Sequence, residues 1–107
     1  MAKTAQELAG IIDQYKSVLA TLGIRVERII LYGSYAQGKA GEESDIDLIV
    51  ISPDFEGKDV RQRLEIMGVA SARIMEPVQA LGVTTAEIES EEVSFFIKEV
   101  LEYGKAA

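Results

Sequence analysis

Apolar positions near the start of the chain follow the spacing of an amphipathic helix. The pattern predicts a helix over Ala5–Thr21, because apolar residues three and four positions apart fall on one helix face. Thr4 and Glu7 form a capping-box pattern at its start, and Gly23 is expected to end it. The expected inner face consists of Leu8, Ile11, Ile12, Tyr15, Val18, Leu19 and Leu22.

Two apolar segments next predict strands that lie side by side. Residues 26–32 are rich in β-branched and aromatic side chains, and Ile46–Ile51 is apolar on both faces, as is typical of a central strand. The connection between them is too short for a crossover helix, which favours antiparallel pairing. This connection is expected to hold a short helix over residues 35–38, capped by Ser34, and then a loop over residues 39–43.

The following part of the chain predicts a helix and then a strand. Asp59 is expected to cap a helix that runs to Ala70. Residues 73–81 are expected to form a third strand, at the edge of the sheet because Pro77 cannot donate a hydrogen bond to a neighbouring strand. The expected inner face of the helix consists of Val60, Leu64, Ile66 and Met67.

A last helix is predicted over residues 91–103, after a polar link at Thr84 and Thr85. Ser90 is its expected cap, and Gly104 is expected to end it. The side chains expected to face inward are Val93, Phe96, Ile97, Val100 and Leu101.

This order of elements predicts an α/β, or α+β, fold in which helices pack a small mixed sheet of three or more strands. At 107 residues, the chain is expected to form a single domain over residues 1–107. It has material for one core but little for a separate substrate-binding lobe.

Composition narrows the chemistry available to the chain. It contains neither cysteine nor histidine, which excludes disulfides, thiolate metal sites and histidine-based catalytic triads. The formal net charge of −7 argues against broad nucleic-acid binding, and it suits a protein that attracts divalent cations or a basic partner. No apolar run is long enough to span a bilayer, and the N-terminus does not resemble a signal peptide, so we expect no membrane association and a cytoplasmic location.

Two aspartates stand one residue apart where the second predicted strand begins. Side chains at positions i and i+2 of a strand face the same way, about 7 Å apart, so Asp45 and Asp47 are expected to point in one direction. Two ionised carboxylates this close raise each other's pKa unless a cation compensates. Mg²⁺ is the simplest such cation, because it prefers oxygen ligands and substrate phosphates.

Gly33 and Ser34 come before this pair, at the end of the first predicted strand. Backbone N–H groups at a helix start form an anion site, and glycine lets the backbone approach a ligand closely. The Ser34 hydroxyl can donate to a phosphate oxygen, although simple helix capping is its structural alternative. Both residues are therefore candidates for binding nucleotide phosphates.

A P-loop shares part of this pattern, because Gly33 is followed by four residues and then by Gly38 and Lys39. However, Ala40 stands where a magnesium-binding Ser or Thr belongs, and a strand follows where a long helix belongs. Both differences argue against a P-loop.

A calcium loop shares a different part of the pattern, because its ligand series also opens with alternating aspartates such as Asp45 and Asp47. Ile49 and Ile51 occupy the positions where its oxygen ligands should continue, which argues against it. A turn without function and a polar strand end would each explain one piece of the pattern but not their combination.

The combination of Gly33-Ser34, ten further residues and Asp45-x-Asp47 resembles the signature of the minimal nucleotidyltransferases, within the DNA polymerase β-like superfamily. The resemblance is dense over residues 29–50 and extends loosely over the rest of the chain. It implies that the Gly-Ser turn and the short helix after it hold nucleotide phosphates, and that both aspartates ligate Mg²⁺. In that family a third carboxylate on a later strand completes the site.

Glu76 is the expected third carboxylate, because it falls in phase with Ile74 and Val78 on the third predicted strand. Its structural alternative is a charge that protects an edge strand. Two metal ions about 4 Å apart would activate an acceptor hydroxyl and stabilise pyrophosphate as it leaves. The chain departs from the family at Gln37, where Arg is usual, so Lys39 is the candidate source of positive charge toward a triphosphate.

The resemblance implies transfer of a nucleoside monophosphate, AMP from ATP, to an acceptor hydroxyl. The small size of the domain favours recognition of the acceptor through a protein partner or through self-association. Many family members are encoded beside a HEPN-domain protein and act as antitoxins, some by adenylylating the toxin. The alternative is a non-catalytic module that binds a nucleotide or a partner and neutralises that partner by contact, and Gln37 favours it.

Overall fold

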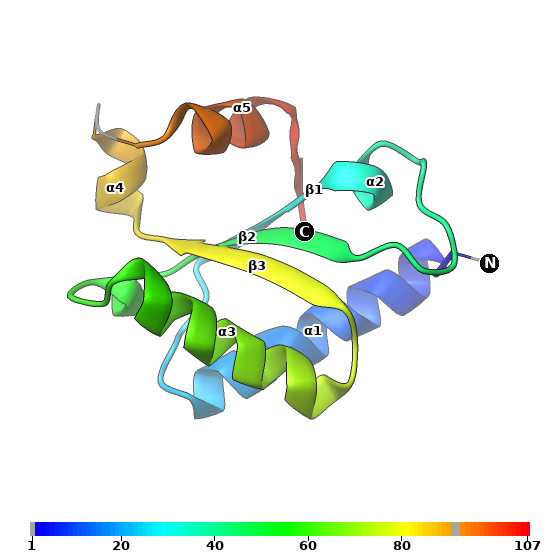
Figure 1. The fold of residues 1–107 in the computed structure, drawn as a ribbon, viewed down its shortest axis with the longest axis horizontal. Coiled ribbons are helices and arrows are strands. Elements are labelled where there is room, and N and C mark those ends of the chain that lie inside the picture. Colours follow the sequence, from blue (N-terminus) through cyan, green and yellow to red (C-terminus); the bar gives the residue numbers. More distant parts are fainter. Residues whose placement is uncertain (1, 91–92) are drawn as a thin grey trace.

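The described part of the chain forms one mixed sheet with helices on both faces (Figure 1). The structure, a computed structural model, describes residues 2–90 and 93–107. The strand order is β3-β2-β1-β4, in which β2 and β3 run parallel while β1 is antiparallel to both β2 and β4. The strands are β1 (Arg28–Tyr32), β2 (Ile46–Ile51), β3 (Val78–Val83) and β4 (Lys105–Ala106). The predicted fold class, the antiparallel first pair and the central second strand are confirmed.

Helices of different length cover the two faces of the sheet. The long helices α1 (Ala5–Thr21) and α3 (Val60–Ile74) lie together on one face, and α5 (Phe95–Tyr103) lies on the other, with α4 (Thr85–Glu89) beyond one end of the strands (Figure 1). The short elements are α2 (Gly33–Ala36), between β1 and β2, and a 3₁₀ turn, η1 (Pro53–Phe55), after β2. No described helix is both long enough and apolar enough to cross a bilayer.

Alternation along the central strands divides the core in two. On the face covered by α1 and α3, the buried sheet residues are Ile29, Leu31, Ile46, Leu48, Val50 and Val78. On the face covered by α5, they are Ile30, Ile49, Ile51 and Val83. The strand β2 is therefore apolar in both directions because each face packs against helices, as the sequence predicted for a central strand.

The first helix has the predicted bounds because its local signals agree. Thr4 accepts a hydrogen bond from the Glu7 N–H at 3.1 Å, and the Thr4 N–H donates to the Glu7 carboxylate at 3.0 Å. This reciprocal pair satisfies N–H groups that have no partner within the helix. In the core, the hydroxyl of Tyr15 donates to the Met67 carbonyl at 3.1 Å, which joins α1 to α3.

The predicted third strand is wrong over residues 73–77. The helix α3 starts after its predicted cap, Asp59, but continues to Ile74, where Met75 turns the chain in a left-handed conformation (φ 56°). The helix continues because Ile74 packs against the larger core. Pro77 therefore precedes β3 instead of lying within it, while the predicted edge position of β3 is confirmed.

The predicted inner face of this helix is only partly correct. Met67 is buried and Ile66 packs against the larger core, but Val60 and Leu64 are 71% and 46% exposed. Both side chains line an open cavity beside the end of β3, together with Leu81 and Val83, and are therefore only partly covered.

The last third of the chain contains more structure than predicted. Thr84 and Thr85 do not form a simple link, because Thr84 caps α4 through a capping box with Glu87. Ser90 ends that helix, and Ser94 caps α5 instead. Residues 91–92 of the predicted helix lie outside the described residues, whereas its predicted end at Tyr103 is confirmed.

Candidate active site

The candidate motif comes together where β1 ends, α2 begins and β2 starts. Tyr32, the last residue of β1, pairs with Asp47 of β2, so the turn that follows β1 lies directly beside that aspartate. The helix α2 begins at Gly33 and not at the predicted Tyr35. No side chain in the described part of the chain caps it, so the predicted capping by Ser34 is wrong.

Gly33 and Asp47 are in close contact. Gly33 has a φ of +73°, and a Cβ atom at this position would occupy the space taken by a carboxylate oxygen of Asp47. Any residue other than glycine would therefore meet both an unfavourable backbone conformation and a clash. The sequence predicted that Gly33 lets the backbone approach a ligand closely, and this stays a prediction. The group that the structure places against Gly33 is the carboxylate of Asp47.

The environment of the two aspartates is electrostatically unfavourable without a cation. Burial, and next to it the negative charge of Asp45, raise the pKa of Asp47 above its ordinary value. Asp45 itself is exposed immediately before β2, and no lysine or arginine among the described residues forms an ion pair with either carboxylate. A hard divalent cation would relieve this repulsion, so these two residues fit the implied Mg²⁺.

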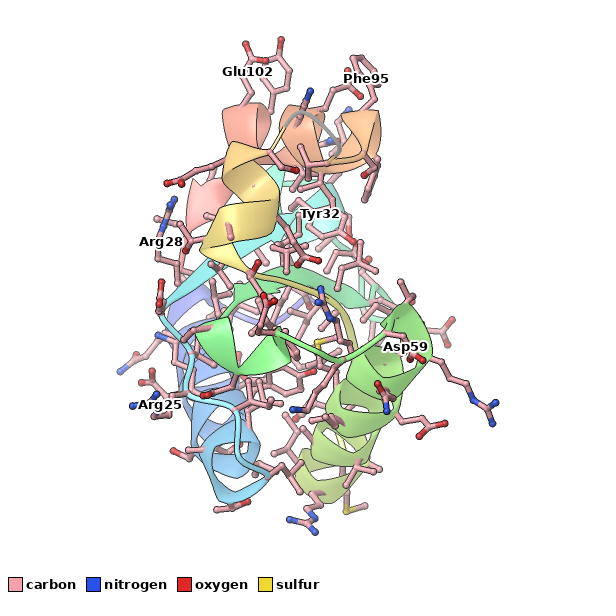
Figure 2. The ribbon with its side chains drawn as sticks, turned by 90° about the vertical axis from the view of Figure 1, so that its left-hand side faces the viewer. Arg25, Arg28, Tyr32, Asp59, Phe95 and Glu102 are labelled. Atoms are coloured by element: carbon pink, nitrogen blue, oxygen red, sulfur yellow. The ribbon has the colours of Figure 1, made fainter. Side chains whose placement is uncertain are left out.

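Tyr32 lies beside Asp47, as its partner on the neighbouring strand β1. Burial raises the pKa of its phenol, and the nearby charge of Asp47 raises it further. Its ring meets the ring of Phe96 edge to face, with centroids 5.7 Å apart, which connects the site to α5. Figure 2 shows Tyr32 toward the body of the molecule, whereas Phe95 and Glu102 project outward from α5.

Glu76 does not join the aspartates in a three-carboxylate cluster. It lies in the connection between α3 and β3, where its Oε2 is 3.5 Å from the Nζ of Lys3. Among the described residues, no group of three acidic or other metal-binding side chains is placed to hold one ion. The strand position predicted for Glu76 is wrong for the reason given above, and its role as a metal ligand stays a prediction.

Gln37 and Lys39 lie on the loop after α2. Gln37 ends the helix, and its backbone N–H donates to the Gly33 carbonyl at 3.1 Å. The Lys39 N–H donates to the Ser34 carbonyl at 2.9 Å, while its side chain is exposed. These two bonds hold the loop in a compact shape next to the Gly-Ser turn.

A cavity of about 450 Å³ adjoins this turn. It lies between α2 and α5, and the sequence did not predict it, because it depends on how the last helix packs across the sheet. Its walls are formed by Tyr32, Gly33, Ala36, Gln37, Phe96, Glu99, Val100, Tyr103 and Gly104.

The sequence also gave no reason to single out Gln79. In the parallel register of β2 and β3, Gln79 is the residue opposite Asp47. It is exposed, while its neighbour Val78 is buried in the larger core. Only the pairing of strands that are far apart in sequence brings this amide next to the acidic pair.

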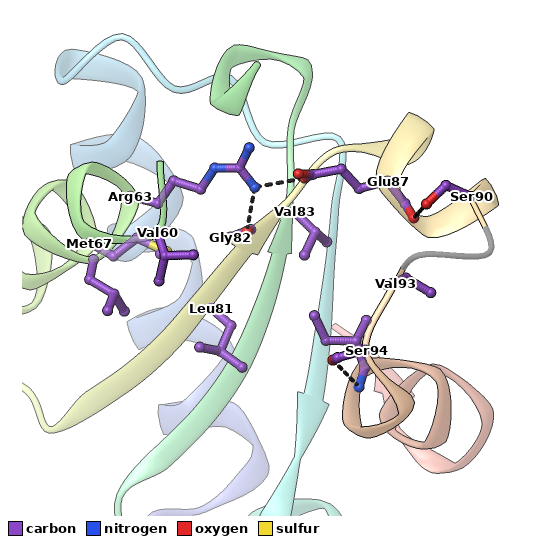
Figure 3. A pocket seen from close by; sticks show the side chains of 12 residues that line it. Val60, Arg63, Met67, Leu81, Gly82, Val83, Glu87, Ser90, Val93 and Ser94 are labelled. Atoms are coloured by element: carbon purple, nitrogen blue, oxygen red, sulfur yellow. Dashed lines mark hydrogen bonds and ion pairs between the residues drawn. The ribbon is translucent and has the colours of Figure 1, made fainter. Parts of the chain in front are cut away.

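A second cavity, of about 330 Å³, lies at the far end of β3 (Figure 3). Arg63 spans one side of it, donating to the Gly82 carbonyl at 3.1 Å and to the Glu87 carboxylate at 2.6 Å. The hydrogen bond from Arg63 holds the pKa of Glu87 below its ordinary value. Arg63 also donates to the carbonyls of Phe55 and Lys58. Its guanidinium therefore joins α3 to the loop after β2, to β3 and to α4.

Comparison with known proteins places this geometry in context. A family model described as a nucleotidyltransferase domain matches residues 12–106. Two curated relatives from Methanocaldococcus jannaschii, both provisionally named protein adenylyltransferases, are 33% identical over 66 residues and 44% identical over 48 residues. These matches cover 61% and 45% of this chain, and 65% and 47% of the two relatives. The chain thus matches less than two thirds of the length of each relative.

Solved structures show the same fold at low identity. A toxin–antitoxin crystal structure with AMP-PNP has a TM-score of 0.61 at 22% identity, and covers 88% of this chain and 69% of that chain. A provisionally named nucleotidyltransferase from Sulfolobus solfataricus has a TM-score of 0.52 at 20% identity, with 83% of each chain covered. A mutant of the toxin–antitoxin MntA-HpeT has a TM-score of 0.57 at 20% identity, and covers 92% of this chain and 69% of that chain.

Proposed function

Because the chain belongs to the nucleotidyltransferase domain family, we propose that it transfers AMP from ATP to an acceptor hydroxyl and releases pyrophosphate. The observation that carries this proposal is the contact between Asp47 and Gly33. It sets an acidic residue against the turn that is the candidate phosphate site, and the charge of Asp45 acts on the same carboxylate. Metal-bound and phosphate-bound groups could therefore meet at one place.

Each residue has a defined role in this proposal. Asp45 and Asp47 would hold Mg²⁺, which would neutralise phosphate charge and stabilise the pyrophosphate that leaves. The turn at Gly33 and the hydroxyl of Ser34 would bind phosphate oxygens, and Lys39 would add positive charge from the adjacent loop. Gln37 would contribute only neutral hydrogen bonds, since an amide carries no charge.

The acceptor in this proposal is a hydroxyl group on a protein partner. The relatives named protein adenylyltransferases and the toxin–antitoxin structural neighbours support a protein acceptor. We propose a HEPN-type toxin as the partner, with this domain as the antitoxin, acting in the cytoplasm where ATP and Mg²⁺ are available.

The test is transfer of label from ATP carrying ³²P in its α-phosphate. The protein is incubated with Mg²⁺ and the product of the neighbouring gene, and labelled protein is resolved on a denaturing gel. Label on the partner is expected with the natural chain, no label with Asp47→Asn, and full labelling with the control Asp13→Asn. Asp13 is exposed on α1, and α1 covers the face of the sheet opposite to the face that carries Asp47. Equal labelling by Asp47→Asn and the natural chain would refute the proposed role of the acidic pair.

A non-catalytic binding module is the second candidate function. Two neutral amide side chains favour it. Gln37 ends α2 next to the candidate phosphate site, where a positive charge would assist the reaction, and Gln79 lies beside Asp47, where a carboxylate would assist it. Such a module would neutralise its partner by contact alone. Partner inhibition that persists in Asp47→Asn, with no label transferred by the natural chain, would establish this function in place of the enzyme.

A further inference from the structure

Gln79 is the strand neighbour of Asp47 on the side away from Tyr32. The parallel register pairs Ile46 with Val78 and Asp47 with Gln79. Paired residues on adjacent strands are about 4.8 Å apart and point to the same face of the sheet. Since Val78 is buried in the core under α1 and α3, Gln79 faces the opposite way, on the face that carries Asp47.

The two strand neighbours of Asp47 are thus a phenol and an amide. Tyr32 lies on one side and presents a hydroxyl group, not a carboxylate. Gln79 lies on the other side and has no titratable proton. Neither neighbour supplies negative charge, and Glu76, the nearest alternative in sequence, has its ion pair with Lys3.

Charge balance then limits how much cation the site can hold. Asp45 and Asp47 together provide two negative charges, which match one divalent ion. A pair of ions about 4 Å apart, as in two-metal sites, would bring four positive charges close together, and nucleotide phosphates would have to supply all the ligand charge beyond the two carboxylates. An amide oxygen can coordinate an ion but does not offset its charge.

We propose that Gln79 restricts the acidic pair to a single divalent cation and leaves the site without a third carboxylate from the described residues. This inference rests on the proposed function only for the nucleotide-bound state. For the protein alone it depends on the placement of Gln79 beside Asp47. A carboxylate at position 79 would add both a ligand and a proton acceptor, so Gln79 sets the metal stoichiometry of the site.

The test measures Mn²⁺ binding to the intact chain without nucleotide, by titration calorimetry. The substitution Gln79→Glu keeps the shape of the side chain and adds one charge, and it is expected to tighten Mn²⁺ binding by about tenfold, because affinity follows the charge count of the ligands. The control is Gln14→Glu, which makes the same chemical change at an exposed position of α1, on the other face of the sheet from Gln79. It is expected to leave Mn²⁺ affinity unchanged. Equal affinities for the two variants would overturn the proposal.

The second readout is electron paramagnetic resonance with Mn²⁺ and AMP-PNP. The natural chain is expected to hold one Mn²⁺, and Gln79→Glu two spin-coupled ions. Two coupled ions in the natural chain would overturn the proposal even if every variant failed to fold. If only Gln79→Glu fails to fold, Gln79→Asp provides a second variant with a carboxylate at this position. If AMP-PNP does not bind the natural chain, the proposed function fails, while the titration without nucleotide still decides the role of Gln79.

Discussion

The carboxylate of Asp47 lies where a side chain at position 33 would begin. We therefore expect Gly33→Ala to displace Asp47, to abolish Mn²⁺ binding, and to lower the free energy of unfolding by about 2 to 3 kcal/mol through combined strain and clash. Urea unfolding and Mn²⁺ titration measure the two effects.

Gly23→Ala is the matched control, because Gly23 also has a positive φ but has open space around its Cβ position. It is expected to cost only about 1 kcal/mol and to leave Mn²⁺ affinity unchanged. If Gly33→Ala kept full Mn²⁺ affinity, the contact would have no part in the metal site.

Asp47 makes stability depend on pH. Its pKa is raised above the ordinary value of 3.8, so the ionised carboxylate destabilises the folded state at neutral pH, and the penalty disappears as pH falls and both states bind the proton. In EDTA, Asp47→Asn is expected to raise the free energy of unfolding at about pH 7 by less than about 1 kcal/mol, because solvent screens a partly exposed group. The gain should vanish near pH 3, and a gain that is independent of pH would point to packing as its cause.

Glu76 offers a direct test of the ligand predicted from the sequence. Because its carboxylate pairs with Lys3 and does not cluster with the aspartates, Glu76→Gln is expected to leave Mn²⁺ affinity unchanged. The loss of this surface ion pair should cost less than about 0.5 kcal/mol in urea unfolding. A tenfold weaker Mn²⁺ affinity would instead restore Glu76 as a ligand.

Arg63 joins segments that flank the second cavity. A lysine cannot reach the diverging acceptors that the guanidinium reaches, so Arg63→Lys is expected to lower the free energy of unfolding by about 2 kcal/mol. Arg61→Lys is the control on the same helix, because the Arg61 side chain is 88% exposed whereas that of Arg63 is 11% exposed. This substitution should change the free energy of unfolding by no more than about 0.5 kcal/mol. Similar losses in thermal or urea unfolding would show that the network contributes little.

Local patterns in the sequence correctly predicted the first helix and the strand that carries Asp47. The bonds between Thr4 and Glu7, and the alternation that sets Asp47 apart from buried Ile46 and Leu48, involve residues close together in the chain. Their geometry follows from helix and strand periodicity alone. The family resemblance rested on the same segment, and the matched family model confirmed it.

Only tertiary packing decided what surrounds that motif. Ile74 extends α3 because it reaches the core, and that extension removes Glu76 from the strand where periodicity had placed it. The pairing of Gln79 with Asp47 depends on the register between strands separated by a whole helix. No local pattern encodes such a register, since it is set by the combined packing of helices and strands that lie far apart in the chain.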